Sequence, residues 1–526
     1  MRARLPGDYE VRFGAARISE SYGGAFDYDV ARFALPFDSA YSNYRGVGLA
    51  PAAPKDSMGF RLEGGSRGAA GKLWAGSRLI DEGYDLTVEI GLAGASDIGV
   101  DMSNSYRKSI IKKYFLNEDF QYSADAVKYG YYANARLSGE TSSAQFTLAR
   151  YGVSGELPFM LDSRASYARR SLEHRQTTLG LFNLSGLGLN SVKWNFSAYW
   201  AQINSNLTSG PPPGYFGLTP AEPAKSDEKR YGGSLSVETD LSGIAIVGAI
   251  GEYESTDFYG EMNSAVINQL NIQKISGRLF AARNDSFGNY RISAGADVYE
   301  VYGDEKKDKY RATALAAEVV GKIPIGSRLL FDGEISASLL PPKLSDIAAA
   351  ARPASANDFW TTGVRAGLLY RVARGLVAYA GIEHFYFTDS TRRISGSSLR
   401  KKSDKMEEES ISLSYNTDGV RIEAGYENLK SYRSNFLAFG EFHSLFSEIN
   451  IKAFSDKLSF MGEYRMPELG GTAVNLLSVG GSLRVDPALF YLRCDNLLNE
   501  AYEYAPGFPA SGFSFVFGVS VAAGMF

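Results

Sequence analysis

The sequence predicts an all-β fold, a transmembrane antiparallel β-barrel of about 22 strands. Three observations predict it. Segments of about ten residues or more alternate between apolar and polar side chains, and the connections between them are short and long in turn. The 526 residues also include 33 Tyr, 31 Phe and 56 Gly. Aromatic residues favour strands, and a long chain of hairpins that must leave no open edge favours closure into a barrel.

The strand segments are recognised by their period of two. The segments 330–340 (LFDGEISASLL), 419–429 (GVRIEAGYENL) and 477–485 (LSVGGSLRV) each place apolar side chains on one face and Arg, Asp, Glu, Ser or Gly on the other. Strands of soluble proteins average about 5–6 residues, whereas strands that cross a bilayer need about 9–11. The length of these segments therefore favours a membrane barrel over a β-sandwich.

The connections predict the two rims of the barrel. Outer-membrane barrels have tight turns on the periplasmic side and longer loops outside. This rhythm predicts about 15 strands from residue 232 onward and about seven before it. Tight turns are expected at 240–243, 285–289, 323–327, 372–375, 416–419, 454–457 and 485–488, and longer loops near 253–270, 300–310, 339–359, 387–408, 427–443, 464–475 and 498–512.

The last strand, 513–526, illustrates the two faces. Phe513, Phe515 and Phe517 share the face expected to contact lipid, and Ser514 and Val516 share the face expected to line the lumen. We expect this strand to close the barrel against the first strand, near residues 9–18. Because unpaired buried charges are costly, the charges on inward faces are expected to pair across the lumen or to face a plug: Arg291, Asp297, Arg421, Glu423, Arg484, Arg493 and Asp495.

Composition excludes several classes of protein. The net charge is −4, so no basic excess indicates a nucleic-acid partner. A spanning helix needs about 20 mostly apolar residues, and the longest apolar runs, such as 244–250, are shorter. The first 17 residues lack the apolar core of a signal peptide. Cys494 alone cannot form an intramolecular disulfide, and its position predicts a small lipid-facing side chain.

Candidate chemical groups are few. The three histidines, His174, His384 and His443, are far apart in the sequence, so no metal site, cofactor or enzymatic activity is expected. The charged runs 303–311 and Glu407–Glu409 are interpreted as solvated loop tips rather than ligand gates. The aromatic stretches 213–217 and 258–260 are interpreted as interfacial or loop packing, with stacking on a ligand as the alternative.

The C-terminal segment of the sequence resembles the same segment of a known family. The run Asn496, Leu497, Leu498, Asn499 to Tyr502, then a Gly- and Pro-containing loop to Gly512 and a strand ending on Phe526, resembles the end of a TonB-dependent outer-membrane receptor. The resemblance implies that external loops capture a ligand and that TonB rearranges a plug. It also implies that the outer-membrane assembly machinery reads the C-terminal strand.

The chain departs from that pattern in three ways. Gly512 is followed by Phe513 where the family has arginine, and Phe526 falls out of phase unless a bulge or twist near 522–524 restores it. The runs typical of the family's plug are missing, so residues 1–526 are expected to form a single barrel domain without a plug.

The function expected from the resemblance is uptake of a scarce siderophore-, vitamin-, metal- or glycan-like solute across the cell outer membrane. Its partners would be outer-membrane lipid, the assembly machinery, an unidentified small molecule and, only if a plug is supplied, the TonB system. The alternative is a passive pore or surface-binding barrel independent of TonB. A third class, an outer-membrane hydrolase, would need a Ser–His pair on adjacent strands.

Overall fold

The computed structural model describes most of the chain from residue 57 onward. The described residues are 11–13, 16–18, 57–66, 68–81, 83–97, 126–157, 170–188, 192–209, 225–262, 265–285, 288–302, 309–340, 359–394, 398–431, 441–454, 457–469, 472–505, 508–509 and 512–524. Among them no helix is long and apolar enough to cross a membrane.

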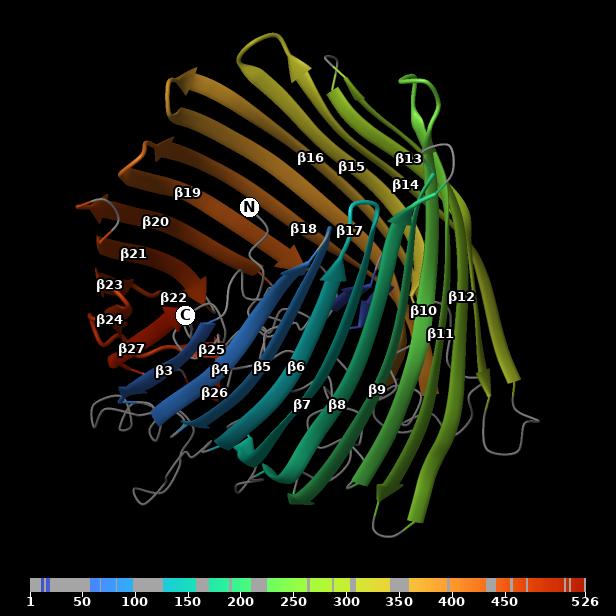
Figure 1. The fold of residues 1–526 in the computed structure, drawn as a ribbon, viewed down its shortest axis with the longest axis horizontal. Helices are drawn as coiled ribbons and strands as arrows, with labels where there is room; N and C mark the ends of the chain where they lie inside the picture. Colours follow the sequence, from blue (N-terminus) through green and yellow to red (C-terminus); the bar gives the residue numbers. More distant parts are fainter. Residues whose placement is uncertain are drawn as a thin grey trace.

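The strands of the described residues close into one antiparallel barrel, whose wall runs in chain order from blue to red in Figure 1. Each strand position in the barrel wall is called a stave here, and strands β3–β9 supply seven of them. Strands β10–β24 with β27 supply fifteen, because β22 and β23 both pair with β21 and make one stave. The total of 22 staves is even, as an up-and-down antiparallel barrel requires. The predicted fold class and strand number are confirmed.

The first part of the wall consists of β3 (Ser57–Gly65), β4 (Gly68–Asp81), β5 (Tyr84–Asp97), β6 (Ala126–Ser138), β7 (Ser142–Leu157), β8 (Arg170–Leu187), β9 (Lys193–Ser209), β10 (Lys225–Asp240), β11 (Ile246–Met262), β12 (Ala265–Asp285) and β13 (Gly288–Tyr302). The second part consists of β14 (Lys309–Ile325), β15 (Leu329–Leu340), β16 (Phe359–Ala373), β17 (Leu376–Ile394), β18 (Ser398–Asn416), β19 (Val420–Ser431), β20 (Glu441–Ala453), β21 (Leu458–Leu469), β22 (Thr472–Ala473), β23 (Leu476–Val485), β24 (Ala488–Asp495) and β27 (Ser514–Gly524).

The barrel closes between β27 and β3. Val516 is opposite Gly65 and Gly524 is opposite Ser57, with no register shift between them, so the bulge considered near 522–524 is absent; Phe526 lies outside the described residues. The prediction that residues 9–18 form the closing strand is wrong. Strands β1 (Val11–Phe13) and β2 (Ala16–Ile18) pair with each other outside the barrel order. Three residues span only about 10 Å, too little to cross a bilayer core of about 30 Å.

The two rims follow the predicted rhythm. Tight connections join β4 to β5, β6 to β7 and every second pair after them, as at 240–246, 285–288, 325–329 and 485–488. The first residue of β3 and the last residue of β27 lie at this tight-turn rim, because β27 runs there from the long connection that follows β24. One short hairpin, made of β25 (Glu503–Ala505) and β26 (Phe508–Pro509), lies in that connection.

Three predicted long loops are strands instead. Strands β11 and β12 stay paired to Met262 and Ala265, β17 and β18 stay paired to Ile394 and Ser398, and β21 continues to Leu469. The polar sequence of these hairpins indicated loops, but the backbone remains paired along them. The hairpins therefore extend the wall beyond its apolar belt.

The outward face is apolar, as predicted for a lipid-contacting surface. Leu279 and Leu315 are 69% and 76% exposed, and Phe513, Phe515 and Phe517 are exposed while Val516 between them is buried. Outward tyrosines mark two levels. Tyr370 of β16 lies near the tight-turn rim, where it is opposite Ala378 of β17. Tyr386 lies on β17, eight residues beyond Ala378. Eight residues advance about 26 Å along a strand, or about 20 Å along the axis of a barrel tilted about 40°.

Candidate functional site: the inner wall of the barrel

The inner wall carries the charged side chains because strand alternation sends every second residue inward. On β24, Phe490 and Leu492 are exposed on the outward face, and Arg493 and Asp495 take the opposite parity. A wall of 22 staves encloses a lumen on the order of 40 Å across. Side chains on opposite walls therefore cannot touch, so each inward charge must find its partner nearby.

One cluster lies on β10 to β13. Arg230 donates to Glu228 of the same strand, and these side chains are only 2% and 5% exposed. Two strands on, Arg278 donates through Nη2 to Oδ2 of Asp297 at 3.5 Å. The Asp297 side chain is almost fully buried, and its Oδ1 has no hydrogen-bond partner. Arg291, next along β13, places its guanidinium 4.3 Å from the ring centroid of Phe280.

Further charge pairs continue around the wall. On β15 and β16, Arg365 lies 3.4 Å from Asp332 and 3.2 Å from Glu334. On β19, Arg421 lies 3.0 Å from Glu423. A third group lies on β21 and β24. Arg465 lies 2.7 Å from Glu463, and Arg493 lies 3.4 Å from Glu463 and 2.7 Å from Asp495.

The prediction that inward charges pair across the lumen is therefore wrong, and the alternative, that they face a plug, stays a prediction. Their carboxylate partners are two residues away on the same strand, or lie on the next staves of the wall. The physical reason is reach, since an arginine side chain is far shorter than the radius of the lumen. Arg484 differs from the other predicted charges, because it is exposed beside the tight turn that follows β23.

An apolar strip on the inner wall was not predicted. Leu179 and Leu181 of β8 pack with Tyr199 and Ala201 of β9, and all four are buried. The outward neighbour Trp200 is 41% exposed, so the shielded face of β9 is the inward one. Strand β1 lies against β9. The sequence signal was present, because Tyr199, Ala201 and Ile203 are apolar on the face opposite Trp200.

The C-terminal motif residues build the connection after β24. Asn496 lies at a φ of 49°, and its side chain both donates to the carbonyl of Glu500 and accepts from the Glu500 N–H, each at 2.9 Å. Asn499, at a φ of 52°, accepts from the N–H of Phe513 at 2.9 Å. The turn is thereby tied to the residue that precedes β27.

The other motif residues lie around this turn. The Leu497 N–H donates to the carbonyl of Leu477 at 2.8 Å, and Tyr502 is buried. Gly512 is buried immediately before Phe513. Phe526 lies outside the described residues. The role of this motif in barrel assembly stays a prediction.

The histidines do not come together. His174 is exposed on β8, His384 lies 3.1 Å from Glu407 across β17 and β18, and His443 shares a 2.6 Å hydrogen bond with Tyr426. In the part of the chain that the structure describes, no three His, Cys, Asp or Glu side chains form a metal-binding group.

The structure bears on two predictions about single groups. Cys494 is partly exposed and has the outward parity of Phe490 and Leu492, as predicted. The interpretation of Glu407–Glu409 as a loop tip is wrong, because these residues lie within β18 and pair with residues of β17. Residues 213–217 and 303–308 lie outside the described residues, and Phe258 and Tyr259 lie in β11 with opposite exposures.

Comparison with solved structures supports the fold assignment. The FrpB iron transporter from Neisseria meningitidis (F3-3 variant) superposes with a TM-score of 0.69 at 12% identity, covering 90% of this chain and 82% of that one. The copper transporter OprC gives 0.70 at 12% identity, with 90% and 84% covered. The siderophore receptor PiuA from Acinetobacter baumannii gives 0.63 at 12% identity, with 90% and 82% covered.

Neither the models of known protein families nor the curated proteins match this sequence. The evidence for likeness is therefore the fold, which extends over nine-tenths of the chain and includes the closure of β27 on β3. The resemblance found in the C-terminal sequence is confirmed at this level. The chain has the closed antiparallel β-barrel fold of the outer-membrane iron, copper and siderophore transporters and receptors.

Proposed function

We propose that this chain is the barrel of an outer-membrane receptor or transporter that takes up a scarce solute, coupled to TonB where a plug is supplied. The observation that carries the proposal is the shielded inner wall. Arg230, Asp297 and Val301 all have inward parity, and their exposed fractions are 2% or less. An open lumen of this width would leave such side chains wet. Shielding of these side chains from water supports regulated passage rather than free diffusion.

The polar character of the inner wall supports passage of a hydrophilic solute. Arginine–carboxylate groups line β10–β13, β15–β16 and β21–β24. Because these charges neutralise one another, these groups give the described part of the wall no single-sign field that would select cations or anions by charge alone. Selection would then fall to the long connections at the opposite rim, as the resemblance implies.

The known cargoes of the structural neighbours support a solute class. They are an iron transporter, a copper transporter and a siderophore receptor. We propose that this chain takes a chelated metal or a solute of similar size, with vitamin- and glycan-like solutes as the remaining members of the class. Fold alone does not determine the cargo, so the cargo must be found by direct uptake assays.

The outward face supports location in the outer membrane. It combines an exposed apolar belt with tyrosines at two levels about 20 Å apart, close to the apolar band of about 25 Å known for outer-membrane barrels. The proposed orientation places the tight turns in the periplasm. The assembly machinery would read β27, and the described barrel residues would form one domain.

Uptake by cells tests this proposal. The full chain is expressed in the outer membrane of a strain without its own high-affinity iron uptake, and a radioactive iron(III) chelate and radioactive copper(II) are supplied in parallel. Saturable accumulation that stops when a protonophore collapses the inner-membrane potential supports a TonB-coupled receptor. Non-saturable accumulation that ignores the protonophore supports the alternative, a passive pore.

The same cells separate a third possibility. A surface-binding barrel would retain the labelled solute in the outer-membrane fraction, and no label would reach the cytoplasm. Fractionation after washing distinguishes retention from transport. Retention without transport of every solute supplied would refute the proposed transport function.

A further inference from the structure

The mouth of the barrel at the tight turns is unevenly charged. At the turns of β4–β13, the exposed charged side chains of the described residues are balanced: Asp81, Arg136, Glu140, Lys193, Asp240 and Arg283. At the turns of β14–β24, exposed cations outnumber exposed carboxylates. The carboxylates are Asp418 and Asp486, and the cations are Lys322, Arg328, Arg371, Arg374, Arg421, Lys452, Lys457 and Arg484. These cations are called the basic crescent. Because the chain as a whole has a net charge of −4, this excess is local.

The strand residues of the crescent face the inside of the mouth. Arg371 follows the outward Tyr370, which is 43% exposed. Arg484 lies between Leu483 and Val485, which are both exposed on the outward face. Strand alternation therefore sends both arginines inward, and Lys322, Arg421 and Lys452 have the same parity. The crescent is open to a molecule that enters the mouth from the tight-turn side, and not to the lipid around the barrel.

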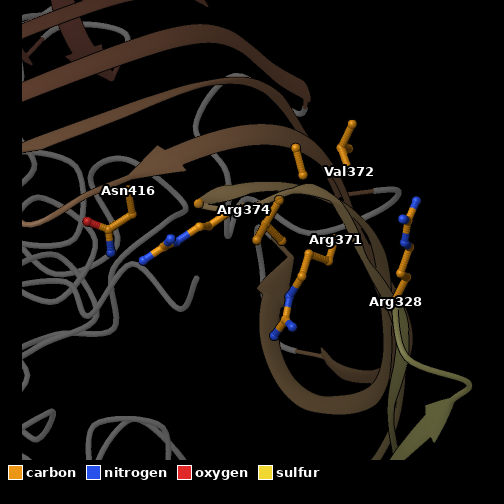
Figure 2. A pocket seen from close by; sticks show the side chains of 8 residues that line it. Arg328, Arg371, Val372, Arg374 and Asn416 are labelled. Atoms are coloured by element: carbon orange, nitrogen blue, oxygen red, sulfur yellow. The ribbon is translucent and has the colours of Figure 1, made fainter.

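A pocket of about 520 Å³ lies within the crescent, where β16 turns into β17 (Figure 2). Backbone hydrogen bonds fix its frame. The Arg371 N–H donates to the carbonyl of Arg328 at 2.7 Å, and the Asn416 N–H donates to the carbonyl of Gly375 at 2.8 Å. Gly375, at a φ of 78°, provides the left-handed conformation that the turn requires. The pocket thus joins the ends of neighbouring staves into one ordered surface.

The arginines of this pocket point apart. In Figure 2 the side chain of Arg374 extends toward the side on which Asn416 lies, Arg371 projects beneath the turn, and Arg328 stands at the opposite end. The guanidinium groups of Arg371 and Arg374 are therefore not arranged to hold one anion between them. Each can instead receive a carboxylate of its own, with the side-chain amide of Asn416 as a further donor on the Arg374 side.

The arginines of the crescent differ from those of the wall. Arg365 and Arg493 each lie within 3.4 Å of two carboxylates. Within the part of the chain that the structure describes, Arg371, Arg374 and Arg484 make no ion pair. Hydrogen bonds between a guanidinium and a carboxylate are about twice as strong as neutral ones. These three arginines can therefore attract and bind an anionic group that comes from solution.

The length of the crescent indicates an extended anion. From Lys322 on β14 to Arg484 on β23 the wall advances by eight stave-to-stave steps, and steps of about 4.8 Å give an arc of about 40 Å. A small anion would contact one or two of these cations. An extended peptide of about 12 residues covers the same distance at about 3.3 Å per residue, and its alternate side chains share one face.

The lining of the pocket favours a peptide over an inorganic polyanion. Ala373 and Val377 line it together with the arginines, and Val377 has inward parity because it precedes Ala378, which is opposite the outward Tyr370. Apolar contacts of this kind stabilise a peptide side chain. They give no such contact to a polyphosphate.

We propose that the basic crescent docks an acidic, extended segment of a partner protein that enters the mouth from the tight-turn side. Its carboxylates would bind Arg371, Arg374 and Arg484. In the proposed orientation of the barrel this side is the periplasm, so the partner is a periplasmic protein. The proposal does not depend on which solute crosses the barrel.

Peptide binding to the full chain tests the proposal. The chain is purified in a neutral detergent, and fluorescence anisotropy follows a labelled dodecapeptide of alternating glutamate and threonine. The matched probe replaces every glutamate by glutamine. The test variant carries Arg371→Gln and Arg374→Gln. The control variant carries Arg136→Gln and Lys193→Gln, which remove two exposed cations from the other side of the same mouth. Heat-modifiable mobility on gels, in which a folded barrel migrates differently from an unfolded one, confirms that both variants fold.

The glutamate peptide is expected to bind the wild type and the control variant with the same affinity within about twofold. The test variant should bind it at least about tenfold more weakly, because hydrogen bonds to charged groups are lost. Adding Arg484→Gln to the test variant should weaken binding further. The glutamine peptide should not bind at the same concentration, and added salt should weaken binding of the glutamate peptide.

Four results would overturn the proposal. Undiminished binding by the test variant would exclude the pocket, and equal losses in the test and control variants would show a response to overall charge. No further loss on adding Arg484→Gln would exclude docking along the crescent. Displacement of the peptide by citrate or tripolyphosphate at an equal concentration would make the crescent a site for small polyanions.

This proposal and the proposed transport function fail separately. If the test variant loses the peptide but retains solute uptake, the crescent is a docking surface that uptake of the supplied solute does not need. If the wild type takes up no solute but binds the glutamate peptide through the crescent, the transport proposal fails while the docking surface stands.

Discussion

Replacing Arg230 by methionine is expected to destabilise the barrel more than any exposed charge change. The guanidinium and its partner Glu228 are 2% and 5% exposed on the inner wall of β10. The substitution leaves the carboxylate buried without this cation, and breaking such a buried pair costs about 3–5 kcal/mol. Replacing both residues by apolar ones, Glu228→Leu with Arg230→Met, removes both charges and is expected to cost much less than the sum of the single changes.

The same strand provides the control. Lys193 and Glu238 form a 3.6 Å pair between β9 and β10, but their side chains are 65% and 37% exposed. An exposed pair contributes about 0–1 kcal/mol. Changing either residue to an apolar one should therefore shift the free energy of unfolding only slightly, although the change in charge is identical.

The assay is urea unfolding of the full chain in detergent micelles, followed by loss of heat-modifiable mobility. A double-mutant cycle on Glu228 and Arg230 is expected to give a coupling energy of at least about 2 kcal/mol, against less than about 1 kcal/mol for Lys193 and Glu238. Additive effects at Glu228 and Arg230, or equal coupling at the two sites, would refute the claim that the inner wall of β10 is shielded from water.

Three further predictions concern the wall and its closure. Leu279→Arg, on the exposed face between the two levels of tyrosine, should lower the free energy of unfolding in lipid vesicles by about 2–4 kcal/mol; urea unfolding in vesicles and in water-soluble polymers would show whether the cost depends on lipid, and no such dependence contradicts a lipid-facing belt. Asn499→Gly keeps the left-handed φ but removes the bond to Phe513, so it should cost about 0.5–1.5 kcal/mol and speed proteolysis between β24 and β27; unchanged cleavage would count against this role. Gly518→Val should weaken the closure of β27 on β3, because a Cβ there would collide with the ring of Tyr491, whose hydroxyl accepts a hydrogen bond from Arg61 at 2.8 Å. Adding Tyr491→Ala should restore part of the lost resistance to urea. A lack of rescue would exclude the collision.

Much of the wall was predictable because each stave carries its own signal. Strict alternation in segments such as 330–340 fixes both the strand and the face of each residue, so the outward Phe513, Phe515 and Phe517 could be assigned from spacing alone. Tight turns were placed correctly because Gly and Asp mark them locally, as at Gly375 and at 416–419.

The closing strand was not predictable in this way. The segment 8–18 and β3 both alternate, and a local pattern does not tell which of the two pairs with β27. Partner choice depends on contacts between residues some 450 positions apart, such as Val516 with Gly65. The hairpin of β11 and β12 was mistaken for a loop for a related reason, since polar pairs such as Asp257 and Asn271 lie on its paired, outward face.

The candidate site was predicted in part. The sequence indicated which charges face inward, but not that Arg365 would meet Asp332 and Glu334 of the neighbouring stave. Register between strands decides those pairs, and register follows from the whole barrel. The contact between Arg328 and Arg371 was missed because these residues are 43 positions apart and are joined only by the pairing of β15 with β16.

The electrical conductance of the full chain in planar lipid bilayers tests the central claim most directly. A receptor barrel whose inner wall is shielded from water is expected to insert without producing large steady currents, because no continuous water-filled path is open. Native gels of the same preparation confirm that the barrel is folded and inserted. Large, steady, ohmic currents from the folded wild-type chain would contradict the account and would establish a passive pore.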